Sequence, residues 1–169
     1  MNEVFLLLGS DIEPRDKYLA MAEENITVSI GTITKRSEVY ESEAYGFNSD
    51  KNFLNCVLLL SSKLSAEAIL TQIHIIEKKN GRERSNIGYS SRTIDIDILY
   101  FNNEIIKTDY LTIPHPRLHE RNFTIVPLVE IAPDFIHPIL KLNSKQLLEH
   151  CSDIAEVSVV EDTITQDEL

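Results

Sequence analysis

The sequence predicts an α+β fold in which helices pack on an antiparallel sheet. Short apolar runs that end at turn residues alternate with stretches of helical periodicity, and the length suits one domain. Of the 169 residues, 43% are hydrophobic and 25% are charged, the balance of an ordinary globular protein. We therefore expect a single domain over residues 1–169, with residues 155–169 as an acidic tail.

The first half of the chain alternates strands and helices. Residues 4–8 form a continuous apolar run that ends at Gly9, which is typical of a buried strand. A helical stripe then begins at Pro14 and ends near Gly31. The elements expected next are a strand over 32–40, a loop over 41–52, a strand over 53–61 and a helix from Ser65 to Gly81.

The second half adds one more long strand. It is expected over 93–101, and Asn102-Asn103 is expected to turn it into a hairpin with 104–106. Helices are expected over 122–131 and 144–150, and a Val-Ser-Val-Val patch in the tail resembles a strand. The order is β-α-β-β-α-β with helical and hairpin additions toward the C-terminus. This is the order of the ferredoxin-like fold, an antiparallel sheet with helices on one face.

The composition excludes several classes of function. A net charge of -11 argues against a nucleic-acid binder and against adsorption to an anionic membrane. No apolar run is long enough to cross a bilayer, and the N-terminal run has no basic flank, so we expect a cytoplasmic protein. Cys56 lies inside an apolar run, which favours a reduced core thiol over a disulfide with Cys151.

The charge is unevenly distributed. Residues 82–121 carry six basic and six acidic side chains, whereas the rest of the chain is acidic. This neutral stretch holds five of the seven arginines: Arg82, Arg84, Arg92, Arg117 and Arg121. The planar guanidinium suits phosphate oxygens, although solvated surface arginines are an equally ordinary explanation.

Two carboxylates stand out on the strand expected over 93–101. Asp95 and Asp97 are two residues apart and project from the same face, opposite Ile94 and Ile96. Aspartate is disfavoured in strands, and Mg²⁺ accepts one or two carboxylates together with substrate phosphates. Carboxylates for a metal ion and arginines for phosphate indicate phosphoryl transfer, and neither a P-loop nor a kinase Gly-rich loop is present.

A proline- and histidine-rich loop follows over 114–120, just before the helix expected at 122. It carries His115 and His119, either of which can donate to a phosphate oxygen, with Arg117 and Arg121 beside them. A polar capping loop is the plainer interpretation for His119 and Arg117. Zinc spacing is absent.

The ordered motifs resemble one known family, the 6-hydroxymethyl-7,8-dihydropterin pyrophosphokinases of folate biosynthesis. The strongest part is the R-T-x-D-x-D strand over 92–97, followed some twenty residues later by P-H-P-R over 114–117. The other matching segments are Leu8-Gly9-Ser10, Phe53-Leu54-Asn55, Glu77 with Gly81-Arg82, Arg121-Asn122-Phe123, Pro127-Leu128 and Ile131-Ala132-Pro133. The match covers nearly the whole chain.

The resemblance implies a ferredoxin-like fold and transfer of pyrophosphate from ATP to the pterin hydroxymethyl oxygen, with release of AMP. It implies two Mg²⁺ ions held by Asp95 and Asp97, and a catalytic set of Arg82, Arg92, Asp95 and Asp97. The residues implied to bind ATP are Glu77, Arg82, Arg92, His115 and Arg121. The residues implied to bind the pterin are Ser42, Glu43, Tyr45, Gly46, Phe53, Asn55 and Phe123, with the ring stacked between Phe53 and Phe123.

The chain departs from the family pattern at three places, none of which removes an implied metal or phosphate ligand. Gly88-Tyr89-Ser90-Ser91 precedes Arg92 without the usual basic residue, Ser42-Glu43-Ala44 replaces a proline-rich stretch, and Asp11 replaces an asparagine. We expect small-molecule substrates, no nucleic acid, no membrane and a monomer. Two alternatives stay open at this point: a metal-dependent phosphodiesterase that uses Asp95, Asp97 and His115, and a non-catalytic ferredoxin-like ligand-binding module.

Overall fold

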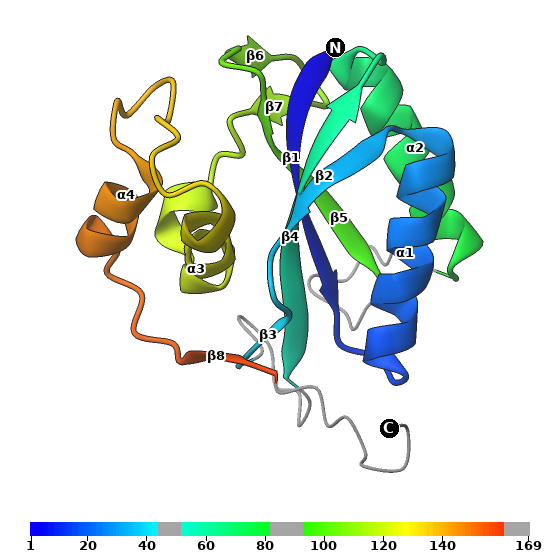
Figure 1. Ribbon diagram of the computed structural model, residues 1–169, viewed down its shortest axis with the longest axis horizontal. Coiled ribbons are helices and arrows are strands. Elements are labelled where there is room, and N and C mark those ends of the chain that lie inside the picture. Colours follow the sequence, from blue (N-terminus) through cyan, green and yellow to red (C-terminus); the bar gives the residue numbers. More distant parts are fainter. Residues whose placement is uncertain (44–51, 82–92, 161–169) are drawn as a thin grey trace.

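The computed structural model describes residues 1–43, 52–81 and 93–160. The strands of the main sheet are β1 (Asn2–Ser10), β2 (Thr32–Arg36), β3 (Tyr40–Ser42), β4 (Phe53–Ser62), β5 (Asp95–Phe101) and β8 (Val157–Val159). Their order is β5-β1-β4-β3-β8, and β2 also pairs with β4. Every pair is antiparallel, so the predicted α+β, ferredoxin-like fold is confirmed (Figure 1).

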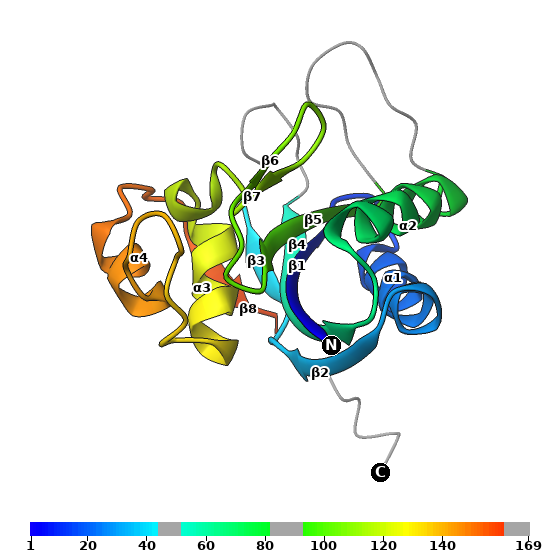
Figure 2. The ribbon, with the colours of Figure 1, turned by 90° about the horizontal axis from the view of Figure 1, so that it is seen from above.

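Helices cover both faces of this sheet. Helices α1 (Arg15–Ser29) and α2 (Ala66–Lys79) lie on one face, and α3 (Asn122–Ile131) and α4 (Ser144–His150) lie on the other (Figures 1 and 2). The two helices of the βαββαβ core thus share one face, as expected, and the additional helices α3 and α4 cover the other face. The alternation along β1 gives the reason, because Leu6 and Leu8 pack against α1 and α2 while Phe5 and Leu7 pack against α3 and α4.

Local capping interactions mark the starts of α2 and α4, whereas α1 and α3 begin without a side-chain cap from the preceding residue. The Ser65 hydroxyl caps α2 by accepting from the Ala68 amide at 3.2 Å, and Gly81 follows the helix with a φ of 84°. Asn143 and Gln146 form a reciprocal capping box at the start of α4. Helix α3 begins after Arg121, whose side chain makes no capping hydrogen bond.

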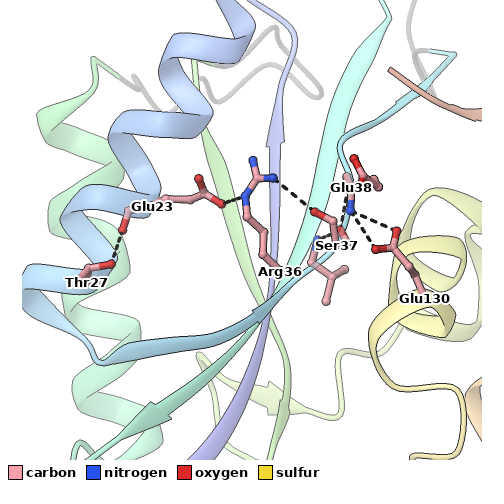
Figure 3. Close-up of polar contacts among 7 residues, drawn as sticks. Glu23, Thr27, Arg36, Ser37, Glu38 and Glu130 are labelled. Carbon is pink, nitrogen blue, oxygen red and sulfur yellow. Dashed lines mark hydrogen bonds and ion pairs between the residues drawn. The ribbon is translucent and has the colours of Figure 1, made fainter. Parts of the chain in front are cut away.

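The single strand expected over 32–40 is divided into β2 and β3. Between them the Ser37 hydroxyl accepts from the Val57 amide at 2.9 Å, and the Glu38 amide donates to the Glu130 carboxylate of α3 at 3.1 Å. Arg36 at the end of β2 pairs with Glu23 of α1 (Figure 3). This break therefore ties both helical layers to the sheet, which a strand pattern in the sequence does not predict.

The hairpin expected at Asn102-Asn103 does not form. Strand β6 (Ile106–Lys107) pairs instead with β7 (Thr112–Ile113). Asn102 has a φ of 50°, and its side-chain oxygen accepts from the Glu3 amide at 2.9 Å. The turn thus stays attached to β1 and directs the chain away from β5. The backbone of β5 instead makes hydrogen bonds to Glu77 and to the His115 amide.

The remaining structural predictions concern the cysteines and membrane helices. Cys56 is fully buried and unpaired, as predicted, and burial raises the pKa of its thiol to about 12; Cys151 is also unpaired. Among the described helices, none has the length and apolar character that a bilayer-spanning segment needs. A single-turn 3₁₀ helix, Leu118–Glu120, precedes α3.

Candidate active site

The face of the sheet that carries α3 changes from apolar to polar along its strands. Leu7 of β1, Val57 of β4 and Leu99 of β5 belong to the core under α3 and α4. The next positions with the same side-chain direction are Gly9 on β1 and Asn55 on β4. On β5 they are Asp97 and, after it, Asp95. In the register Gly9 is opposite both Asn55 and Asp95, so an amide and a carboxylate flank a glycine in one row across the sheet.

Gly9 keeps this row open. A Cβ at this position would lie 2.8 Å from Nδ2 of Asn55. The Asn55 amide is buried, and its Nδ2 donates to the Leu8 carbonyl at 3.2 Å. Its Oδ1 is buried without a hydrogen-bond partner within the described ranges. Because an unsatisfied buried acceptor is costly, this oxygen suits a hydrogen-bond donor on a ligand.

Asp95 and Asp97 stand at the start of β5, half-buried, between the buried side chains of Ile94, Ile96 and Ile98. The predicted alternation is therefore confirmed. Strand β5 is at the edge of the sheet, and its Ile96 amide donates to the Glu77 carboxylate of α2 at 3.0 Å. Glu77 is only 4% exposed, and through this hydrogen bond it supports the strand that carries the two carboxylates.

His115 reaches the same carboxylates from the loop before α3. Its backbone amide donates to the Leu99 carbonyl of β5 at 3.0 Å, and its Nε2 lies 4.0 Å from Oδ2 of Asp97. Nδ1 accepts from the Arg117 amide at 3.2 Å, so in the neutral ring the proton is on Nε2. Burial lowers the pKa of His115 to about 4, assisted by the positive charge of Arg121 and opposed by Asp95.

The start of α3 brings an arginine and an aromatic ring together. The guanidinium carbon of Arg121 lies 5.4 Å from the centre of the Phe123 ring, which is cation–π range. Phe123 is partly buried, and Nε of Arg121 is buried without a partner in the part of the chain that the structure describes. At the N-terminus of α3, the Nε–H of Arg121 can therefore donate a hydrogen bond to a ligand, and the Phe123 ring can stack against one.

Two more predicted pterin residues lie on β3 and β4. Ser42 is opposite Phe53 in the register, two residues along from the pair of Tyr40 and Asn55. Ser42 is 3% exposed, and its hydroxyl has no hydrogen-bond partner among the described residues. Phe53 therefore faces the same side of the sheet as Asn55, the side that α3 covers.

A cleft of about 470 Å³ lies along the outer edge of β5. Its walls come from α2, from the first residues of β5, from the segment 108–112 and from the start of the 114–120 loop. The side chains that line it include Leu70, His74, Glu77, Asp95, Asp97, Leu111 and His115. Asp95 and Asp97 thus border both this cleft and the polar row on the α3 face.

The predicted site residues divide into those that the structure describes and those that lie outside the described ranges. Arg82, Arg92, Tyr45 and Gly46 lie outside the described residues, as do Arg84 and Tyr89. Glu43 is described and is exposed. The structure therefore brings together Glu77, Asp95, Asp97 and His115 around the cleft, with Arg121 near His115, and it places Ser42, Phe53 and Asn55 on the sheet face beside them.

Sequence reasoning missed two features of this site. It gave no role to Gly9, although a glycine inside a strand commonly marks close approach of another group. It also missed Asp153, whose carboxylate accepts from the Asn122 amide at the start of α3 at 2.9 Å. No local pattern announces that contact, because the two residues are 31 positions apart.

The donor set suits a metal ion shared with a substrate. No group of three or more His, Cys, Asp or Glu side chains arranged to hold a metal occurs within residues 1–43, 52–81 and 93–160. Two half-buried carboxylates on one strand face fit Mg²⁺, which completes its octahedral shell with water and phosphate oxygens.

Comparison with known proteins gives a consistent result. Residues 5–133 match the family model described as 7,8-dihydro-6-hydroxymethylpterin-pyrophosphokinase. The 2-amino-4-hydroxy-6-hydroxymethyldihydropteridine pyrophosphokinase of Aquifex aeolicus is 41% identical over 146 residues, which cover 86% of this chain and 90% of that protein. The enzyme of the same name from Bacillus subtilis is 37% identical over 134 residues, covering 77% of this chain and 78% of its own length.

Solved structures support the fold. The HPPK-DHPS protein of Plasmodium falciparum superposes with a TM-score of 0.69 at 16% identity, over 88% of this chain. This chain spans only 44% of that longer protein. With the family model matched over most of its length, the chain belongs to the 7,8-dihydro-6-hydroxymethylpterin-pyrophosphokinase family.

Proposed function

We propose that this chain transfers the terminal pyrophosphoryl group of ATP to the hydroxymethyl oxygen of 6-hydroxymethyl-7,8-dihydropterin and releases AMP, in folate biosynthesis. Membership of the family makes the chain an ATP-dependent pyrophosphokinase that acts on small molecules. The observation that carries the detailed proposal is the position of Asp95 and Asp97 between the cleft and the polar row. Neither a phosphodiesterase nor a non-catalytic module is supported by the relatives.

We assign the cleft beside β5 to ATP. Its volume of about 470 Å³ is within the ordinary range for small-molecule sites. Leu70 and Leu111 give it an apolar part suited to a base, and the two carboxylates give it a polar end suited to a metal-bound triphosphate. His115 presents its Nε2 proton at that end, where it can donate to a phosphate oxygen without carrying a charge.

We assign the α3 face of the sheet to the pterin. Asn55 and Ser42 supply polar atoms there that lack partners among the described residues, and Gly9 leaves room beside them. Phe53 and Phe123 come from the two elements that border this space, and each is partly buried. Polar atoms at the bottom and aromatic rings at the sides suit a flat heterocycle with hydrogen-bonding edges.

Asp95 and Asp97 are proposed to hold two Mg²⁺ ions, together with phosphate oxygens of ATP. When bound, the ions would neutralise charge on the triphosphate and orient it toward the acceptor oxygen. Glu77 keeps the two carboxylates in place through its hydrogen bond to the Ile96 amide. In this proposal Glu77 supports the strand, and Asp95 and Asp97 are the metal ligands.

The arginines are proposed to complete the phosphate site. Arg121 holds its guanidinium against Phe123, which would put positive charge next to the pterin and its reacting hydroxyl. Arg82 and Arg92 are assigned to the phosphates because of the family motif. In the reaction, the hydroxymethyl oxygen bonds to the β-phosphorus, the bond from that phosphorus to the oxygen of AMP breaks, and one proton is released. Positioning and charge neutralisation are the main contributions in such a transfer.

The test is a measurement of AMP. Purified protein is incubated with MgATP in the presence and absence of the reduced pterin, and AMP and ATP are quantified. We expect AMP only when the pterin is present. Loss of ATP without the pterin would instead indicate a hydrolase, and no turnover under either condition would indicate a binding module.

We also propose that residues 1–169 act as one pyrophosphokinase domain in a monomer. The cleft and the polar row are both built from a single chain, which supports this proposal. Light scattering on the purified protein, at the concentration used for the assay, tests it directly. A stable dimer would contradict it.

A further inference from the structure

A C-terminal segment returns to the candidate site after α4. We call residues 153–159 the C-terminal strap. The strap leaves α4, passes the start of α3 and ends as β8, which pairs with β3 (Figure 1). It lies beyond residues 5–133, the part of the chain matched by the family model.

Asp153 in the strap supplies the cap that α3 lacks. Its Oδ2 accepts from the Asn122 amide at 2.9 Å, and its Oδ1 accepts from the Ala155 amide at the same distance. In return, the Asn122 side chain donates to the Asp153 carbonyl at 2.7 Å. A carboxylate at a helix N-terminus satisfies a free amide and also complements the positive end of the helix dipole.

The strap is anchored at its other end beside the acceptor face. Val157 is opposite Ser42 in the β3–β8 pair, and Val159 is opposite Tyr40. The far end of α3 is fixed to the same strand, because Glu130 accepts from the Tyr40 hydroxyl at 2.5 Å. Helix α3 and the strap are therefore both tied to β3, and together they frame the face that carries Asn55.

We propose that Asp153 is a positioning residue for the acceptor substrate, which rests on the function proposed above. Through Asn122 it fixes the first turn of α3, and that turn carries Arg121 and Phe123 on either side of Asn122. Holding these two groups in place before binding lowers the ordering cost of binding the pterin. None of the residues that line the cleft beside β5 belongs to the strap or to the first turn of α3, and of the residues assigned to the phosphates only Arg121 stands at that turn.

The experiment compares two cap deletions. Asp153→Ala removes the cap of α3, and Asn143→Ala removes the capping box of α4, a loss of similar size at a helix that does not carry site residues. Glu156→Ala controls for charge, because Glu156 is an exposed acid of the strap. The readouts are the Kd of the pterin in the presence of a non-hydrolysable ATP analogue with Mg²⁺, the KM of ATP, and amide exchange at Asn122.

We expect Asp153→Ala to weaken pterin binding by roughly 3- to 10-fold, the range that loss of a cap corresponds to. The KM of ATP should change less than the Kd of the pterin does, because only Arg121 of the phosphate site stands at the first turn of α3, and the Asn122 amide should exchange faster. Asp153→Asn retains an amide oxygen that can accept from Asn122, and it should recover most of the affinity. Asn143→Ala and Glu156→Ala should leave pterin binding unchanged.

Three outcomes overturn the proposal. If Asp153→Ala leaves the pterin Kd unchanged while the wild type is active, Asp153 is not a positioning residue and the proposed function stands. If Asn143→Ala weakens pterin binding equally, the effect is general destabilisation. A wild-type chain that neither binds the pterin nor forms AMP contradicts the proposed function itself, and the role of Asp153 is refuted with it.

Discussion

The two faces of the sheet use the same strands for different purposes. Toward α1 and α2, β1 presents Val4, Leu6 and Leu8, and the apolar surface continues along most of the strand. Toward α3 and α4, the same strand presents Phe5 and Leu7 and then Gly9. The first face is an apolar core along most of β1 and ends at the buried Ser10, whereas the second is a core at one end and a candidate site at the other.

The comparison teaches how a site is built into a rigid scaffold. The alternation of side chains is the same on both faces. Three non-apolar residues at neighbouring positions of one face, Gly9, Asn55 and Asp95, are therefore enough to create the polar row. Asn55 and Asp95 are held in place because their neighbours in each strand, such as Cys56 and Ile96, are locked in the opposite core. Substitutions on the two faces should therefore separate stability from substrate binding.

The largest effect is expected for Asp97→Ala. Removing one carboxylate from the junction of the two substrate sites should lower the rate of AMP formation on the order of 1000-fold, because charge on the triphosphate is no longer neutralised. The fold should persist, since Asp97 is half-buried and outside both cores. Steady-state assays and circular dichroism measure both. Asp134→Ala removes an exposed acid beside Lys145 and should keep wild-type turnover; near-normal turnover of Asp97→Ala would contradict the metal assignment.

The opposite result is expected for Ile73→Ala on the other face. Ile73 of α2 is 1% exposed, so truncation should lower the free energy of unfolding by about 2–4 kcal/mol. The KM of the pterin should not change at a temperature where the variant is folded. Ile75 of the same helix is 53% exposed, and Ile75→Ala should cost less than about 0.5 kcal/mol. A raised pterin KM in Ile73→Ala would show that the two faces are not independent.

Part of this architecture could be predicted from the sequence. Local patterns were sufficient for the ends of α3 and α4 and for the shared face of Asp95 and Asp97, because periodicity is a property of neighbouring residues. They did not reveal that helices cover both faces, since α3 and β1 are brought together only in the folded chain.

The misses have a common physical cause. The strand break at Ser37 depends on Glu130, 92 residues from the Glu38 amide that it binds, and the failed hairpin depends on the contact of Asn102 with Glu3. The cap from Asp153 is likewise non-local. Each of these three misses involves a hydrogen bond between distant segments, which no pattern of neighbouring residues announces.

A pH effect on stability is expected on the α3 side. His137 is 3% exposed, and burial together with His119 lowers its pKa to about 4. Between about pH 6.5 and 4 the unfolded chain binds a proton that the folded chain does not, so stability is present above this window and falls as the pH decreases. The loss from His137 is at most roughly 3 kcal/mol.

His137→Asn tests this effect. The asparagine oxygen can replace Nδ1, which accepts from the Leu140 amide at 3.1 Å, and it does not titrate. Urea unfolding at a series of pH values should show a smaller loss of stability in the variant than in the wild type. His150 is exposed, and His150→Asn serves as the control. Equal pH dependence of His137→Asn and the wild type would contradict the assignment.

The smallest effect is the sharpest test of the comparison, because it adds a single methyl group at each of two glycines, one in the polar row and one in the connection between α1 and β2. In Gly9→Ala the new Cβ meets the end of the Asn55 side chain at 2.8 Å, and rotation of that amide relieves the contact. The amide then loses its hydrogen bond to Leu8, so we expect roughly fivefold weaker pterin binding and a loss of stability of about 1 kcal/mol. In Gly31→Ala the Cβ meets the Ser61 carbonyl at 2.3 Å, and a backbone atom cannot rotate away. Stability should fall there with no change in pterin affinity. If Gly9→Ala binds the pterin as well as the wild type does, the polar row is not the acceptor site.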